Sequence, residues 1–131
     1  MALDSAGFVA MARYGGYRWS VAQYVALAGA FPWAWWASMD FGCEPEVAGN
    51  RGEVTARVER TAEYLERCSL EARRVGISPP MPVLQGWTPE DYVYSIELTD
   101  TALYPGRWPR LVGLGSVCRR PLHGPCGLRS I

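Results

Sequence analysis

The sequence predicts an α/β fold in which the strands of a parallel β-sheet, open or closed into a barrel, alternate with helices packed on its faces. The main observation is the order of the patterns: short apolar stretches alternate with stretches of helical periodicity, as strand, helix, strand, helix, strand, helix, strand. A second observation is composition. The chain has 131 residues, 49% of them hydrophobic and 20% charged, which fits one globular domain and argues against disorder.

The first third predicts a strand and two helical stretches. Residues 1–4 are expected to form a short strand, followed by a turn and a short helical or irregular piece to about Arg13. The sequence YGGY at 14–17 predicts a flexible turn. The stretch SVAQYVALAGAF begins with the N-cap residue Ser20, has apolar residues at helical spacing, and is ended by Pro32.

The middle third predicts a buried strand and the longest helix. WAWWASMDF at 33–41 favours a strand that ends at Asp40, with a helix as the alternative, and CEPEVAGNRG at 43–52 favours a loop. From Arg51 to Gly76 the pattern is strongly helical. One apolar stripe alternates steps of four and three residues, through Val54, Val58, Thr61, Leu65, Cys68 and Ala72. The charged residues between them predict a solvated face with helical ion pairs.

The last third predicts two further strands around one helix. MPVLQGW at 81–87 is a compact apolar strand, and Thr88 then begins a helix that runs to about Leu103 before YPGRWP breaks it. RLVGLGSV at 110–117 predicts the last strand. We therefore expect a domain over residues 1–120 and an irregular tail over residues 121–131.

Composition limits the class of protein. All 13 basic residues are arginine and are balanced by 13 acids, which does not fit a strongly electropositive nucleic-acid binder. A GC-rich coding sequence explains the absence of lysine more simply than phosphate recognition does. The four cysteines form no C-x-x-C pair, and no apolar run is long enough to cross a bilayer. We expect a cytoplasmic protein with reduced thiols, no metal, no cofactor and no membrane partner.

Polar residues stand where each predicted strand ends. They are Asp4, Asp40, Gln85 and the run Gly113 to Ser116. Because ligands bind at the carboxyl ends of parallel strands, these groups are expected at one rim. Two carboxylates, a carboxamide and backbone amides can bind a polar heterocycle, and Phe8 can stack on a flat ring. The structural alternatives are N-caps for the acids, a loop-bonding amide for the glutamine and a tight turn for the glycines.

Four segments, in order, resemble the tRNA-guanine transglycosylase (queuine tRNA-ribosyltransferase-like) superfamily. They are LDSAGF, SMDFGCEP, VLQGW and VGLGSVCRR, and together they are most similar to the branch that inserts 7-deazaguanine bases into DNA. The resemblance covers nearly all of residues 2–120. It implies a (β/α)8 barrel, here without its first and last strands, that exchanges guanine for a deazapurine through a covalent glycosyl intermediate.

The resemblance also implies residue roles. Asp4 would act beside the reacting sugar and base, Phe8 would stack on the base, and Asp40 would recognise its amino-pyrimidinone edge. Gln85 would contact the base carbonyl. The backbone amides of Gly115, Ser116 and Val117 would help to hold the base, with a purine or 7-deazapurine base and DNA (or tRNA) as the expected partners.

The chain departs from this family in three ways. Ala6 and Ser116 stand where the family has glycine. The family's nucleophilic aspartate lies on a later strand, and no residue here matches it. A whole barrel needs about 250 residues, so we expect a truncated or split member that a second chain completes. The alternatives are an inactive remnant that at most binds a purine-like base, and a small α/β interaction module.

Overall fold

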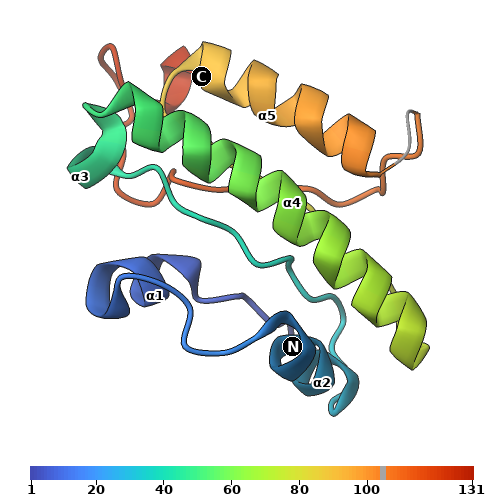
Figure 1. Cartoon of the computed structure of the whole chain (residues 1–131). Helices are drawn as coiled ribbons and strands as arrows, with labels where there is room; N and C mark the ends of the chain where they lie inside the picture. The colour runs from blue at the N-terminus through green and yellow to red at the C-terminus, as the bar shows by residue number, and fades with distance from the viewer. Residues whose placement is uncertain (104–105) are drawn as a thin grey trace.

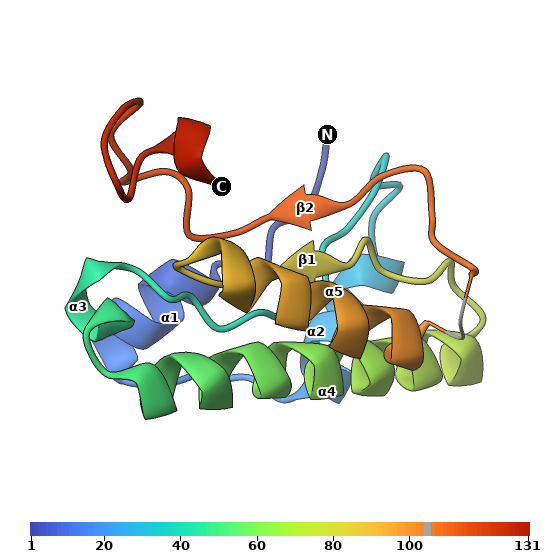
Figure 2. The same cartoon turned by 90° about the horizontal axis from the view of Figure 1, so that it is seen from above.

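The computed structural model describes residues 1–103 and 106–131. Helices α2, α4 and α5 lie on the same side of a layer of extended segments (Figures 1 and 2). The elements are α1 Gly7–Tyr14, α2 Val21–Gly29, α3 Pro45–Ala48, α4 Arg51–Val75, β1 Val83–Leu84, α5 Pro89–Ala102, β2 Gly113–Leu114 and the 3-10 helix η1 Leu128–Ser130. The chain is therefore a mixed α/β fold with five α-helices and a small parallel sheet in its described part.

Parallel pairing joins four extended segments in their sequence order. A bridge pairs Leu3 with Trp36, a second pairs Ala37 with Met81, and β1 pairs with β2. All of these pairings are parallel, as the alternating pattern predicts. Residues 33–41 are thus extended where they pair, so the helical alternative for this segment is wrong. Closure of the segments into a barrel stays a prediction.

The regular ladders are shorter than the predicted strands. Strands were expected over 1–4, 33–41, 81–87 and 110–117, but β1 and β2 have two residues each and the first two segments hold single bridges. The apolar runs indicate burial only in part, since Trp36, Ala37 and Val83 are buried whereas Leu111 and Leu114 are exposed. A ladder also needs successive backbone pairs in register. Pro82, which has no N–H, lies between the Met81 bridge and β1 and contributes only its carbonyl, to Gly113.

Helix α4 forms the centre of the helical layer. Its six predicted stripe residues are all buried, and the helix contacts α2 on one side and α5 on the other. Asn50 caps its N-terminus, and Gly76, with φ of 79°, ends it in the left-handed conformation that glycine adopts freely. The other faces carry the expected helical ion pairs, Arg57–Glu53, Arg67–Glu63 and Arg74–Glu71.

The starts of α2 and α5 follow the predicted capping chemistry. Ser20 and Thr88 each form a capping box, with Gln23 and Asp91 respectively, and Pro89 occupies the first turn of α5. Helix α2 ends at Gly29, three residues before Pro32. Helix α5 ends at Ala102, and the predicted break over 104–109 begins outside the described residues.

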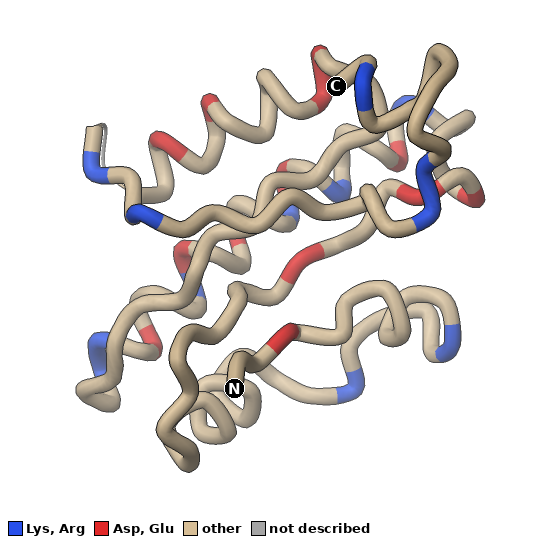
Figure 3. Tube along the Cα trace, turned by 180° about the vertical axis from the view of Figure 1, so that it is seen from behind, with Lys and Arg blue, Asp and Glu red and all other residues tan. Residues whose placement is uncertain are grey.

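Two segments expected to be irregular contain short helices. The loop at 43–52 holds α3, whose first residue, Pro45, is pre-organised for a helix. The tail holds η1. Acidic and basic residues are interspersed along the chain, as Figure 3 shows from behind. No helix of the described residues is long and apolar enough to cross a membrane.

Candidate functional site

Asp40 is the centre of a hydrogen-bonded cluster at the ends of the parallel segments. Its Oδ1 accepts a hydrogen bond from the Ser5 hydroxyl at 2.5 Å, and its Oδ2 accepts one from the side-chain amide of Gln85. Ser5 and Gln85 are each 1% exposed. The ends of the first, second and third extended segments therefore meet at one carboxylate, as the parallel order predicts.

The fourth segment joins the cluster through Ser116. The Ser116 hydroxyl donates to Gln85 Oε1 at 2.6 Å and accepts from the backbone N–H of Cys43 at 2.7 Å. On the other side of Asp40, the Ser5 hydroxyl accepts from the Gly7 N–H at 3.2 Å. Two chains of donors thus end on the Asp40 carboxylate, one from each side. Such chains stabilise the ionised form of the acid on which they end.

Two glycines are needed for the close packing of this cluster. A Cβ on Gly115 would lie 2.2 Å from the Gln85 amide nitrogen, and a Cβ on Gly7 would lie 2.6 Å from the Asp40 carbonyl oxygen. Neither distance is available to a real side chain. The sequence pattern singled out Gly115 but not Gly7.

Ala6 and Ser116, the two positions where the sequence resemblance leads one to expect glycine, have left-handed backbones. Ala6 has φ of 58° and Ser116 has φ of 57°, and they are the non-glycine residues with positive φ in the described part of the chain. Residues with a Cβ adopt this conformation at a cost of about 1–2 kcal/mol. Both departures therefore keep the backbone shape that glycine would favour.

Burial raises the pKa of the Asp40 carboxyl above its ordinary value. Hydrogen bonds from Ser5 and Gln85 act in the opposite direction, and the nearby negative charges of Asp4 and Glu44 raise the pKa further. While the Asp40 carboxyl is ionised, it can accept further hydrogen bonds from a bound molecule. Each carboxylate oxygen uses one lone pair within the cluster and keeps a second.

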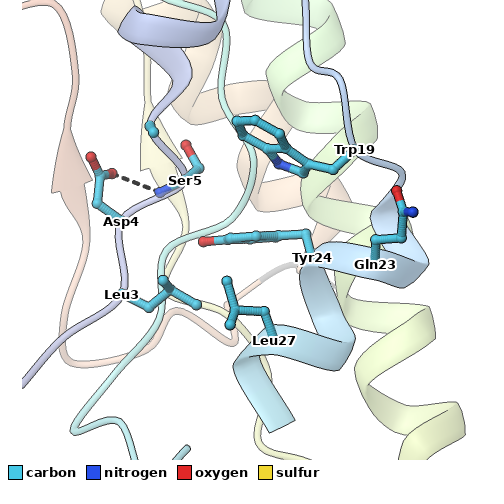
Figure 4. A pocket seen from close by; sticks show the side chains of 8 residues that line it. Leu3, Asp4, Ser5, Trp19, Gln23, Tyr24 and Leu27 are labelled. Atoms are coloured by element: carbon cyan, nitrogen blue, oxygen red, sulfur yellow. Dashed lines mark hydrogen bonds between the residues drawn. The ribbon is translucent and has the colours of Figure 1, made fainter. Parts of the chain in front are cut away.

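Asp4 lies beside the cluster and is exposed. Its Oδ1 accepts the backbone N–H of Ser5 at 2.9 Å. It lines a pocket of about 400 Å³ whose opposite wall is formed by Trp19 and Tyr24 (Figure 4). In Figure 4 the Asp4 carboxylate points away from both rings.

Phe8 and Val117 lie outside the hydrogen-bonded cluster. Phe8 is 45% exposed, and the Arg119 guanidinium lies 5.8 Å from its ring centroid. It lines a separate hollow of about 300 Å³ with Glu46 and Arg57. The Val117 carbonyl accepts from the Arg120 N–H at 3.1 Å. The structure thus brings Asp40, Gln85 and Ser116 together and places Asp4 next to them.

The backbone groups that follow β2 differ in whether they are hydrogen-bonded. The Gly115 N–H donates to Leu84 and its carbonyl accepts from the Tyr92 hydroxyl, so both groups are occupied. Within residues 1–103 and 106–131, the N–H groups of Ser116 and Val117 have no protein acceptor. These two N–H groups are therefore not used by the described part of the chain, and Ser116 itself contacts Gln85 through its hydroxyl.

Comparison with known families identifies the chain. The family model DpdA, described as DeoxyPurine in DNA protein A, matches residues 1–126. The chain belongs to the DpdA family. Neither the curated proteins nor the solved structures gave a match. DpdA membership relates the chain to deazapurine modification of DNA, in agreement with the branch that the sequence motifs resemble.

Arg120 is a structural residue of this DpdA chain that the sequence pattern does not predict. It is 7% exposed and donates to the carbonyls of Gly86, Trp87, Ser116 and Cys126. Its guanidinium also lies 4.0 Å from the Trp87 ring centroid. Arg120 thereby fixes the loops that follow Gln85 and β2. Only its position in the motif VGLGSVCRR could have drawn attention to it.

Chemically, the cluster of this DpdA chain consists of one acceptor, the Asp40 carboxylate, between the donors Ser5 and Gln85. In the described residues no group of three or more His, Cys, Asp or Glu side chains could hold a metal ion. The Cys43 thiol is buried, which raises its pKa to about 12, so it is not a reactive nucleophile. The arrangement is suited to recognising a neutral ring that presents both N–H groups and a carbonyl.

Proposed function

We propose that the Asp40, Gln85 and Ser116 cluster binds guanine or a 7-deazaguanine base during deazapurine modification of DNA. The observation that carries this proposal is the Asp40 carboxylate at the ends of four parallel segments, in a chain of the DpdA family. A guanine edge presents two N–H donors next to a carbonyl. It therefore complements an acid beside amide donors.

The hydrogen-bond donors and acceptors of the cluster support one orientation of the bound base, with its N–H groups toward Asp40 and its carbonyl toward Gln85. The free lone pairs of Asp40 would accept the ring N–H and the exocyclic amine of the base. Gln85 uses one amide hydrogen on Asp40 and keeps a second for the base carbonyl. The N–H groups of Ser116 and Val117 supply two more donors at the same end of the sheet. Phe8 would stack on the base after a rearrangement of its side chain.

The reaction we propose is base exchange, in which a deazapurine replaces guanine through a covalent glycosyl-enzyme intermediate in a (β/α)8 barrel. Asp4 would take the role beside the reacting sugar. The nucleophilic carboxylate of that reaction matches no residue of this chain, so we propose that a second chain completes the barrel and supplies it. The chain alone would then bind the base without exchanging it.

Calorimetric titration of the purified chain with guanine tests the binding site. Asp40→Asn is expected to lower the affinity about 10- to 100-fold, because a bidentate acceptor becomes a mixed donor and acceptor. Asp100→Asn is the matched control, since Asp100 lies on α5 and bonds the Trp108 indole. Equal affinity in the unmodified chain and Asp40→Asn would contradict the site.

Incubation with labelled guanine and either DNA or tRNA tests the reaction and its substrate. Binding without incorporation is the result expected for the chain alone. Incorporation into DNA by the isolated chain would show that the nucleophile lies among the residues present. Incorporation into tRNA alone would contradict the DNA assignment.

A further inference from the structure

Tyr17 makes three contacts at the centre of the cluster. It lies between α1 and α2, in the YGGY sequence that predicts a flexible turn. Its hydroxyl donates to the Asp40 carbonyl at 2.7 Å and accepts from the Asp40 N–H at 2.9 Å. The Ser5 hydroxyl lies 3.0 Å away. A single phenol thus holds both backbone groups of the acid that the site is built around.

We infer that Tyr17 is a positioning residue that holds the Asp40 backbone and thereby aims the Asp40 carboxylate. This inference rests on the proposed function only in taking Asp40 as the base-recognising acid. Tyr17 itself acts through Asp40 and Ser5. Its hydroxyl sets where the carboxylate stands relative to its two donors.

The surroundings of Tyr17 fix the direction of its hydroxyl. Its ring packs edge-on against Trp19 at 5.3 Å and Phe41 at 5.4 Å, and stacks on Tyr64 at 6.4 Å between centroids. Burial, and next the charge of Asp40, raises the pKa of the phenol far above its ordinary value. The hydroxyl therefore keeps its proton and stays a donor to the Asp40 carbonyl.

The hydroxyl hydrogens of Tyr17 and Ser5 link Tyr17 to the protonation state of Asp40. Tyr17 gives its one hydroxyl hydrogen to the Asp40 carbonyl, and Ser5 gives its one to the carboxylate. The 3.0 Å contact between the two hydroxyls therefore has no hydrogen while Asp40 is ionised. A protonated Asp40 can donate to Ser5, whose hydrogen then turns to Tyr17.

Other charged groups near Asp40 must be included in any titration. Asp4 and Glu44 both raise the Asp40 pKa, whereas hydrogen bonds from Ser5 and Gln85 lower it. Weakening either hydrogen bond therefore moves the Asp40 titration upward. Loss of the Tyr17 hydroxyl is expected to do this by releasing the Asp40 backbone.

Carbon-13 NMR of aspartate carboxyls tests the inference without a ligand. The chain has four aspartates, and Asp40→Asn identifies the signal of Asp40. Tyr17→Phe keeps the ring and removes the hydroxyl. Its Asp40 midpoint is expected about one pH unit above that of the unmodified chain, the order of one weakened charge-assisted hydrogen bond.

Tyr64→Phe is the matched control. It removes a hydroxyl from the same aromatic cluster, and in the described residues that hydroxyl has no hydrogen-bond partner. Its Asp40 midpoint is expected to equal that of the unmodified chain. An unchanged midpoint in Tyr17→Phe, or an equal shift in both variants, would overturn the positioning role.

Guanine affinity separates this inference from the proposed function. Tyr17→Phe is expected to bind guanine about 10-fold more weakly than Tyr64→Phe does. If no variant binds guanine, the proposed function fails while the NMR midpoints still decide the role of Tyr17. If the midpoints agree and guanine binds equally, the positioning role fails and the proposed function stands.

A measurement on the unmodified chain decides the matter if Tyr17→Phe does not fold. With tyrosines labelled at the ring carbon that bears the hydroxyl, the Tyr17 signal is expected to shift with the same midpoint as the Asp40 carboxyl. A Tyr17 signal that stays constant through the Asp40 titration would contradict the hydrogen-bond link.

Discussion

The side-chain amide of Gln85 donates to the carboxylate of Asp40 across 45 residues of sequence. The bond joins the ends of the second and third parallel segments. Ser5 and Ser116 extend it to the first and the fourth. Because every extended segment contributes to this one cluster, small changes in its packing are expected to affect both stability and binding.

Gly115→Ala is expected to disrupt the cluster. The new Cβ would lie 2.2 Å from the Gln85 amide, so Gln85 must move away from Asp40. We expect a loss of about 1–3 kcal/mol in the free energy of unfolding, measured in urea, together with weaker guanine binding. Gly49→Ala is the control, since nothing lies within 4 Å of its Cβ position. Equal stability of the two variants would contradict the close packing.

Ala6→Gly is expected to stabilise the chain. Ala6 has φ of 58° just before α1, where glycine avoids the Cβ clash at a smaller entropic cost. We expect a gain of about 0.5–1 kcal/mol in the free energy of unfolding. Ala12→Gly, on the exposed side of the same helix, should lose about as much. A loss at both positions would mean that Ala6 is unstrained.

Replacement of Ser116 by glycine should destabilise the chain less than replacement by alanine. Both substitutions leave the buried Cys43 N–H without its acceptor, which costs about 1–3 kcal/mol. Only glycine also relieves the positive φ, so Ser116→Gly is expected to be about 1 kcal/mol more stable than Ser116→Ala. At Ser69, inside α4, the order should reverse. Urea titrations of the four variants measure both differences.

Asp40 and Asp91 should give opposite pH dependences. For Asp91, burial raises the pKa, but the N–H groups of Thr88 and Trp87 together with Arg51 outweigh it and lower the pKa overall. Its contribution to stability is present above the unfolded pKa near 3.9 and is lost as pH falls through the lower folded value. The raised pKa of Asp40 makes the chain less stable as pH rises from about 4 through the folded value.

Both dependences are measured by the unfolding free energies of the unmodified chain, Asp91→Asn and Asp40→Asn between about pH 2 and pH 8. The advantage of the unmodified chain over Asp91→Asn should shrink toward low pH. Toward high pH, the unfolding free energy of the unmodified chain should instead fall relative to that of Asp40→Asn. Parallel profiles for all three would show that neither carboxyl has a shifted pKa.

The sequence predicts the helical layer better than the extended layer. The stripe from Val54 to Ala72 and the caps at Ser20 and Thr88 are local, so spacing and residue type suffice to define them. The lengths of β1 and β2 depend on register with distant segments, which an apolar run does not encode.

In the candidate site, too, some residues could be predicted from the sequence and others could not. Asp40, Gln85 and Ser116 were identifiable because each follows an apolar stretch and parallel order brings such ends together. Ser5 and Tyr17 were not, because a serine in a turn and a tyrosine beside two glycines have no periodic pattern. Their roles arise only from contacts with a residue more than twenty positions away.

The donor chain that runs from Cys43 through Ser116 and Gln85 to Asp40 also has a kinetic consequence. Its members come from three distant parts of the chain, and Ser5 adds a fourth, so the cluster closes only after the non-local pairings have formed. Contacts of this kind are late events in folding. Acquisition of guanine binding during refolding should therefore lag behind the formation of α4, whose backbone hydrogen bonds join residues four positions apart.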